Sequence, residues 1–100
     1  MKVPVGKNFR IVAYRGFHDL PRIILAESEK SLFWIFYSPF DDDLDEYPDS
    51  YAVFFVGADE NDARAALDEY CAGRVGRIVE TIPVSRFEFD QGRHSSFIVR

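Results

Sequence analysis

Residues 31–56 read SLFWIFYS-PFDDDLDEYPDS-YAVFFV: an aromatic segment, an acidic segment and a second aromatic segment. Aromatic and β-branched residues favour strands, so residues 31–38 and 51–56 are predicted to be two strands joined by a loop. The loop contains six acidic residues and no basic one. Since the whole chain carries a net charge of −5, the other residues together carry +1. One connection between two apolar strands therefore accounts for the excess negative charge.

The remaining sequence predicts more strands around this pair. Further strands are expected over residues 9–15, 22–26, 76–82 and 84–90, with a short last strand over 95–99. Turn-rich segments separate them at residues 16–21, 27–30 and 90–94. Pro83 lacks a backbone N–H, so it should interrupt its strand or place it at the edge of a sheet.

One helix is predicted after the second aromatic strand. Asp59 is a typical N-cap, Glu60 and Asp62 suit the positive end of the helix dipole, and Gly73 stands at the usual stop position. An apolar stripe with helical spacing is formed by Ala63, Ala66, Leu67, Tyr70 and Cys71. The predicted fold is α+β: an antiparallel sheet of about six strands, in the order ββββ-α-ββ, with the helix on one face. The alternative is a curled, barrel-like sheet plugged by the helix.

Both aromatic strands are apolar on both faces. In the first strand, Trp34 and Phe36 point to one side and Phe33 and Ile35 to the other. A single helix can cover only one of these faces. The second must be enclosed by curvature of the sheet, covered by loops, or packed against another chain, and we expect curvature or loops. A homodimer centred on Trp34 or Phe33 is the alternative.

Size and composition indicate a single domain over residues 1–100 with its own core, because 47% of its 100 residues are hydrophobic. No apolar run approaches the ~20 residues that span a bilayer, and no apolar segment follows the basic N-terminus as in a signal peptide. The single Cys71 cannot form an internal disulfide, which is typical of cytoplasmic proteins. Basic residues are scattered along an acidic chain, which argues against nucleic-acid binding.

The acidic loop is the candidate site. Its charges suit a basic protein partner or a cation, and its tyrosines add aromatic contacts. The residues predicted to contact a partner are Asp41, Asp42, Asp43, Asp45, Glu46, Tyr47, Asp49 and Tyr51, with Phe40 and Leu44 as more buried anchors. The spacing of the first acids resembles a calcium loop, but the required Gly and Glu are replaced by Glu46 and Ala52. A solvated loop that merely keeps the aromatic strands soluble is the plain alternative.

Catalytic patterns are missing, so we expect neither an enzyme nor a cofactor. Cys71 is expected to be a buried, inert thiol, and His18 and His94 surface turn residues. Basic residues at 10, 15 and 22 either cluster to bind an anion or pair with nearby carboxylates at 19, 27 and 29. A metal-dependent enzyme using Asp41, Asp43 and Asp49 is the remaining catalytic hypothesis.

Two segments, DLPR at residues 19–22 and the acidic-aromatic residues 39–51, give the chain the general character of bacterial immunity proteins. The chain resembles them as a small, acidic α+β protein without a catalytic set. Immunity proteins neutralise a cognate toxin, often a basic nuclease. The resemblance implies a cytoplasmic inhibitor that covers a basic surface of a toxin or enzyme, and it transfers no residue-level role. The alternative is a small structural or regulatory subunit that homodimerises through an apolar sheet face.

Overall fold

A computed structural model describes residues 2–90 and 95–100 of the chain, and it leaves the side chain of His18 undescribed. His94 and most of the turn expected over residues 90–94 lie outside the described residues. The elements are β1 (Asn8–His18), β2 (Leu20–Glu27), β3 (Phe33–Tyr37), β4 (Ser50–Gly57), α1 (Glu60–Cys71), β5 (Glu80–Pro83), the 3₁₀ helix η1 (Val84–Arg86), β6 (Phe87–Phe89) and β7 (Ser96–Val99).

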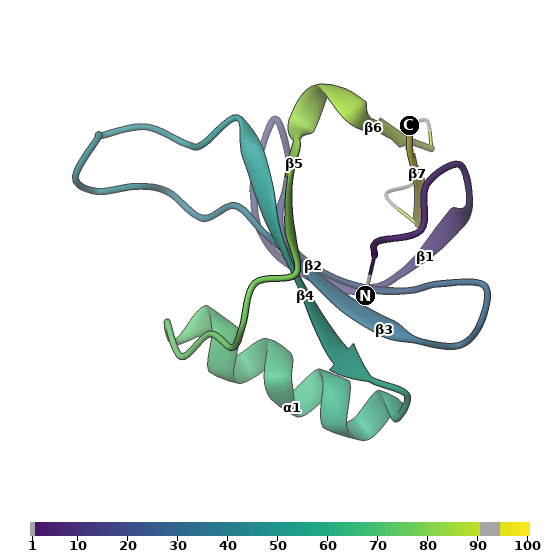
Figure 1. Cartoon of the computed structure of the whole chain (residues 1–100). Helices are drawn as coiled ribbons and strands as arrows, with labels where there is room; N and C mark the ends of the chain where they lie inside the picture. Colours follow the sequence, from purple (N-terminus) through teal and green to yellow (C-terminus); the bar gives the residue numbers. More distant parts are fainter. Residues whose placement is uncertain (1, 91–94) are drawn as a thin grey trace.

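The strands form one antiparallel sheet in the order β5-β4-β3-β2-β1-β7-β6, with α1 on one face (Figure 1). The predicted α+β fold is confirmed, and the short last strand brings the described sheet to seven strands. The sheet also curls, as the alternative prediction had it. The helix lies on the outer face of the curl and does not plug an end.

The curl encloses the second apolar face. Its inner side is filled by a core cluster to which all seven strands contribute, including Phe9, Trp34, Phe36, Val53 and Phe97. Curvature of the sheet therefore encloses the apolar face that the helix does not cover. Trp34 and Phe33, which were expected at the centre of a dimer contact, are only 1% and 3% exposed within their own chain, so these side chains do not form an apolar surface.

Phe36 shows how tightly the curl closes. The centroid of its ring lies 5.2 Å from the ring centroid of Phe9, 5.0 Å from that of Phe97 and 5.6 Å from that of Phe87, and all three pairs are edge-to-face. These partners come from β1, β7 and β6, on the far side of the curled sheet. The two edge strands β5 and β6 are consecutive in the chain, so η1 carries the backbone directly from one edge to the other.

The outer face is covered by α1. Its buried residues Ala63, Leu67 and Tyr70 pack on the side of β3 and β4 that carries Phe33 and Phe54. Side chains therefore alternate between the helix and the inner core along both strands, as predicted. The helix begins at the predicted cap, because Asp59 Oδ1 accepts a hydrogen bond from Asp62 N–H at 2.9 Å.

The helix also ends where expected. Gly73 adopts a φ of +86°, its N–H donates to the Tyr70 carbonyl at 3.0 Å, and Arg74 N–H donates to the Glu69 carbonyl at 2.9 Å. The prediction that Cys71 is buried is wrong, since this thiol is exposed. The ring of Tyr70, one residue earlier, takes the position against the sheet and packs edge-to-face on Phe54 at 4.9 Å.

Several strand boundaries differ from the predictions. The strand expected over residues 84–90 is shortened to β6, and residues 84–86 form η1 instead. β1 and β2 extend into the segment expected to be a turn, and the reversal is reduced to Asp19 with a φ of +66°. β5 is shorter than predicted, because the segment before it follows the end of α1: Gly76 N–H donates to the Tyr70 hydroxyl at 3.0 Å. Pro83 lies in an edge strand, as expected.

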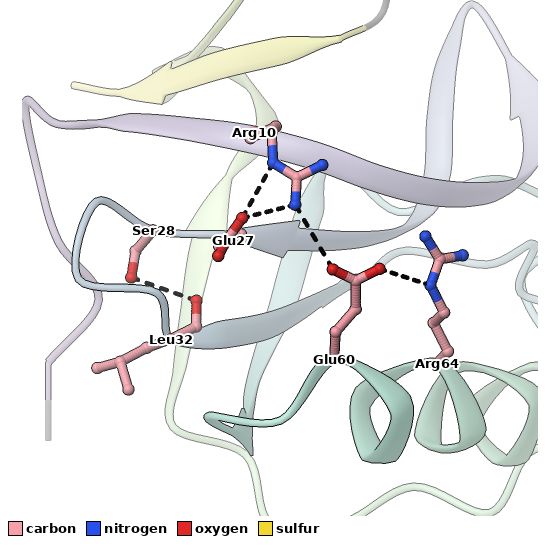
Figure 2. A network of polar contacts seen from close by, with 6 residues as sticks. All are labelled: Arg10, Glu27, Ser28, Leu32, Glu60 and Arg64. Carbon is pink, nitrogen blue, oxygen red and sulfur yellow. Dashed lines mark hydrogen bonds and ion pairs between the residues drawn. The ribbon is translucent and has the colours of Figure 1, made fainter.

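A chain of surface ion pairs links α1 to the sheet. Figure 2 shows Arg10 of β1 donating to Glu27 of β2 at 2.6 Å and lying 3.8 Å from Glu60 of α1. Arg64 pairs with the same Glu60 at 2.9 Å. Exposed pairs contribute little individually, and this set connects the start of the helix to β1 and β2. Arg10 therefore belongs to a local ion-pair network, which was one of the two predicted alternatives.

Candidate interaction site

Between β3 and β4 the chain forms a narrow finger, residues 38–49, which we name the acidic loop. Backbone hydrogen bonds join its two sides: Asp41 N–H donates to the Glu46 carbonyl at 2.8 Å, and Glu46 N–H donates to the Asp41 carbonyl at 3.2 Å. In Figure 1 this finger extends away from the sheet and from α1. Its outer part is therefore held mainly by its own backbone.

The tip of the acidic loop is a tight turn. The Asp41 carboxylate accepts hydrogen bonds from the backbone N–H groups of Asp43 at 3.0 Å and Leu44 at 3.2 Å. Asp45 takes a φ of +55°, a conformation that Asp tolerates better than most residues. This Asp side chain therefore organises the turn and leaves the neighbouring carboxylates directed to solvent.

Arg22 supports the base of the acidic loop from β2. Its buried guanidinium lies 4.5 Å from the centroid of the Tyr47 ring and donates to the Pro48 carbonyl at 3.1 Å and to Ser38 Oγ at 3.3 Å. Tyr47 in turn packs edge-to-face on Phe40 at 5.1 Å. Arg22 and Arg10 thus have separate partners and do not converge on one anion site.

The negative charge of the acidic loop is not neutralised within the described part of the chain. Arginines form ion pairs with Glu27, Glu60, Glu69 and Glu88, and none of the described pairs involves an acid of the loop. Five of the loop's acids are exposed and Asp41 is half-buried. Together they form a concentrated negative surface beside a nearly neutral remainder.

The structure corrects the predicted apolar contacts of this site. Tyr51 is 0% exposed, and its hydroxyl donates to the Pro21 carbonyl at 2.5 Å, so it belongs to the inner core and cannot contact a partner. Phe40 and Leu44, expected to be more buried, are 41% and 66% exposed. Both belong to the finger beyond the end of β3, where the sheet no longer covers them. They replace Tyr51 as the apolar part of the site, whereas Tyr47 is half-buried at its base.

An open groove of about 580 Å³ runs along the acidic loop. Its lining combines apolar surface from β3 and β4 with carboxylates of the loop. The lining includes Tyr37, Phe40, Asp41, Asp43, Ala52 and Thr81. Such a groove suits a long cationic side chain, whose carbon stem contacts apolar surface while its charged end meets carboxylates.

The catalytic alternatives find no support in the geometry. Within residues 2–90 and 95–100, no group of three His, Cys, Asp or Glu side chains is placed to hold a metal ion, so Asp41, Asp43 and Asp49 are not brought together as the metal hypothesis required. Burial of part of the Cys71 side chain raises the pKa of its thiol, although nearby Arg15 lowers that pKa to a smaller extent. This thiol is exposed but is not activated as a nucleophile.

Comparisons with protein families, with curated proteins and with solved structures found no match for this chain. No helix in the described part of the chain is long and apolar enough to cross a membrane.

Proposed function

We propose that this protein is a non-enzymatic binding module of the inhibitor or immunity type, which covers a basic surface of a toxin or enzyme with its acidic loop. The observation that carries the proposal is the concentration of exposed carboxylates that have no ion-pair partner among the described residues, beside the exposed side chains of Phe40 and Leu44. The small, acidic, single α+β domain agrees with the general character of immunity proteins.

Electrostatics supports a basic partner. Like charges on the acidic loop repel one another, each close pair by about 1 kcal/mol in water, and a positive surface would relieve that repulsion. A charged patch mainly accelerates encounter, whereas apolar contacts mainly slow dissociation. Asp42, Asp43 and Asp45 would provide the first effect, and Phe40 and Leu44 the second.

The shape of the acidic loop supports direct docking. Its cross-finger hydrogen bonds, the turn organised by Asp41 and the packing of Tyr47 on Arg22 fix the loop before any partner binds. A preorganised loop loses less conformational entropy on binding than a disordered one. The adjoining groove offers a place for one arginine or lysine of the partner.

Affinity capture from source-cell lysate tests the proposal when three immobilised proteins are compared. The first is the wild type, and the second carries D42N, D43N, D45N and E46Q in the acidic loop. The third carries the same loss of four charges elsewhere on the surface, at D62N, D68N, E69Q and E88Q. We expect a protein with a basic surface to be retained by the wild type and the third protein, and lost by the second.

Titration calorimetry with the captured protein, once purified, completes the test. Binding to the wild type should weaken as NaCl rises from 0.05 to 0.5 M, because salt screens the loop charges. F40A and L44A should each speed dissociation in a surface-resonance measurement. If the loop-neutral variant binds as tightly as the wild type, the acidic loop is not the interface and the proposal is wrong.

A further inference from the structure

A second cavity lies at the end of the molecule opposite the acidic loop. Its volume is about 370 Å³, and it is formed by the N-terminal segment, residues 2–7, and the turn between β2 and β3. That turn precedes β3 and the acidic loop follows it, so the two regions lie at opposite ends of one strand (Figure 1). We name this cavity the lysine pocket because Lys2, Lys7 and Lys30 line it.

These three residues are all the lysines of the chain, whose other basic residues are arginines and two histidines. Glu29 also lines the pocket, so the charged side chains around it sum to about +2. Among the described residues, none of the three lysine ammonium groups forms an ion pair with a carboxylate, and the described ion pairs all involve arginines. An acidic protein has thus gathered positive charge around one concave site.

The walls of the lysine pocket are apolar. Pro4, Val5 and Leu32 line it, and Trp34 borders it while remaining only 1% exposed, with Nε1 donating to Ser28 Oγ at 3.4 Å. The site combines an aromatic and aliphatic surface with ammonium groups around it. Both features are typical of pockets that orient small ligands.

The pocket is held in place from both sides. Val3 is buried in the inner core, and Gly6 N–H donates to the carbonyl of Val99 in β7 at 2.8 Å, which together fix the N-terminal segment. On the other side, Ser28 N–H donates to the Leu32 carbonyl at 2.8 Å and closes the turn. The concave shape is therefore part of the fold.

We propose that the lysine pocket binds a small amphipathic carboxylate. Its apolar body would contact Pro4, Val5 and Leu32, and its carboxylate would lie among the ammonium groups. An inorganic anion would leave the apolar walls without a partner, and a neutral apolar molecule would leave the lysines without a counter-charge. The volume lies within the usual range for small-molecule sites, about 300–1,000 Å³. This site and its ligand are independent of the function proposed for the acidic loop.

Trp34 provides a direct readout, because it is the only tryptophan of the chain and it lines the pocket. Three probes separate the contributions: octanoate carries both features, 1-octanol lacks the charge, and acetate lacks the apolar body. We expect a saturable change in Trp34 emission with octanoate, at a Kd about tenfold lower than for either other probe. Equal responses to octanoate and 1-octanol would overturn the proposal.

Charge variants test the same site. K2Q/K7Q/K30Q should weaken octanoate binding about tenfold, whereas E29Q should strengthen it and K2R/K7R/K30R should retain it. R64Q/R74Q/R77Q removes three positive charges outside the pocket and should leave the Kd within about twofold. Circular dichroism verifies that each variant is folded. If K2Q/K7Q/K30Q does not fold, the octanoate affinities of E29Q and K2R/K7R/K30R still test the role of charge at the pocket.

A membrane surface is the competing explanation for lysines around apolar side chains. Co-sedimentation with vesicles of phosphatidylcholine and phosphatidylglycerol tests it in parallel. Binding to octanoate in solution without vesicle binding supports the proposal. Vesicle binding together with no emission change from octanoate overturns it, as does a K2Q/K7Q/K30Q variant that binds octanoate as the wild type does.

Discussion

At the scale of single residues, Tyr51 is the position where sequence and structure differ most in consequence. Burial raises the pKa of its hydroxyl above the ordinary 10.0, and nearby Arg22 lowers that pKa only in part. The folded protein therefore keeps Tyr51 protonated and donating to the Pro21 carbonyl. The unfolded chain releases that proton from about pH 10 upward, so stability is fully present below pH 10 and falls as pH rises beyond it.

Replacing Tyr51 by Phe tests this role. Y51F should lower the free energy of unfolding at pH 8 by about 1–2 kcal/mol, because the Pro21 carbonyl loses its donor. Between pH 9 and 11 the variant should lose about 1 kcal/mol less than the wild type. Urea unfolding of both proteins at pH 8, 9 and 11 measures these free energies, with a substitution at the exposed Tyr14, Tyr14→Phe, as control. Burial also raises the pKa of Tyr37, so part of the alkaline loss should persist in Y51F.

Gly76 is in close contact with the Tyr70 hydroxyl, which leaves no room for a larger residue at position 76. A Cβ placed there would lie 2.7 Å from Tyr70 Oη, the atom that accepts the Gly76 N–H. G76A should therefore destabilise the protein by about 1–3 kcal/mol. Removing the hydroxyl should relieve the clash, so Y70F/G76A should be more stable than the sum of the two single effects predicts. Additive thermal-denaturation results would show that this contact does not hold the segment after α1.

At the scale of elements, local sequence patterns predicted the positions of most strands and of the helix. They failed where a contact with a side chain distant in sequence determines the structure. Alternation and aromatic content placed β3 and β4, and Asp59 and Gly73 placed the ends of α1. The start of β5 was missed because the Tyr70 hydroxyl binds the preceding backbone. Arg22 was missed as the support of the acidic loop because Pro48, which accepts its hydrogen bond, is far away in sequence.

The cap of α1 gives an element-scale prediction. D59A removes the carboxylate that accepts from Asp62 N–H, and it should lower stability by about 1 kcal/mol, or about 4–8 °C in Tm. D68A, in the later, exposed part of the same helix, removes an acid that lies toward the negative end of the dipole. Thermal denaturation should therefore show little loss for D68A. An equal loss in both variants would mean that the Asp59 cap is not what stabilises the first turn.

At the scale of the whole molecule, the curl of the sheet decides what reaches the surface. It buries Trp34 and Phe36 in the inner core and removes the apolar face that would have favoured a dimer. It also brings the N-terminal segment beside the β2–β3 turn, which creates the lysine pocket. No local pattern contained this information, because scattered lysines in a sequence do not reveal which of them the register of a sheet brings together.

The distribution of charge gives the last prediction, because two sets of acids differ in whether they have ion-pair partners among the described residues. D42N/D43N/D45N removes charges that repel one another, whereas E27Q/E60Q/E88Q removes charges paired with Arg10, Arg64 and Arg100. Both variants lose three negative charges. At low salt the loop variant should gain up to about 1 kcal/mol of stability, and the paired-acid variant should lose about that much.

Thermal denaturation in 0.02 and 0.5 M NaCl measures both effects. Salt should stabilise the wild type more than the loop variant, because the repulsion that salt screens is already absent from that variant. If D42N/D43N/D45N and E27Q/E60Q/E88Q change stability in the same direction and by the same amount, stability depends on the total charge and not on where the charge lies. The acidic loop would then store no repulsion for a basic partner to relieve, and the electrostatic basis of the proposed function would be lost.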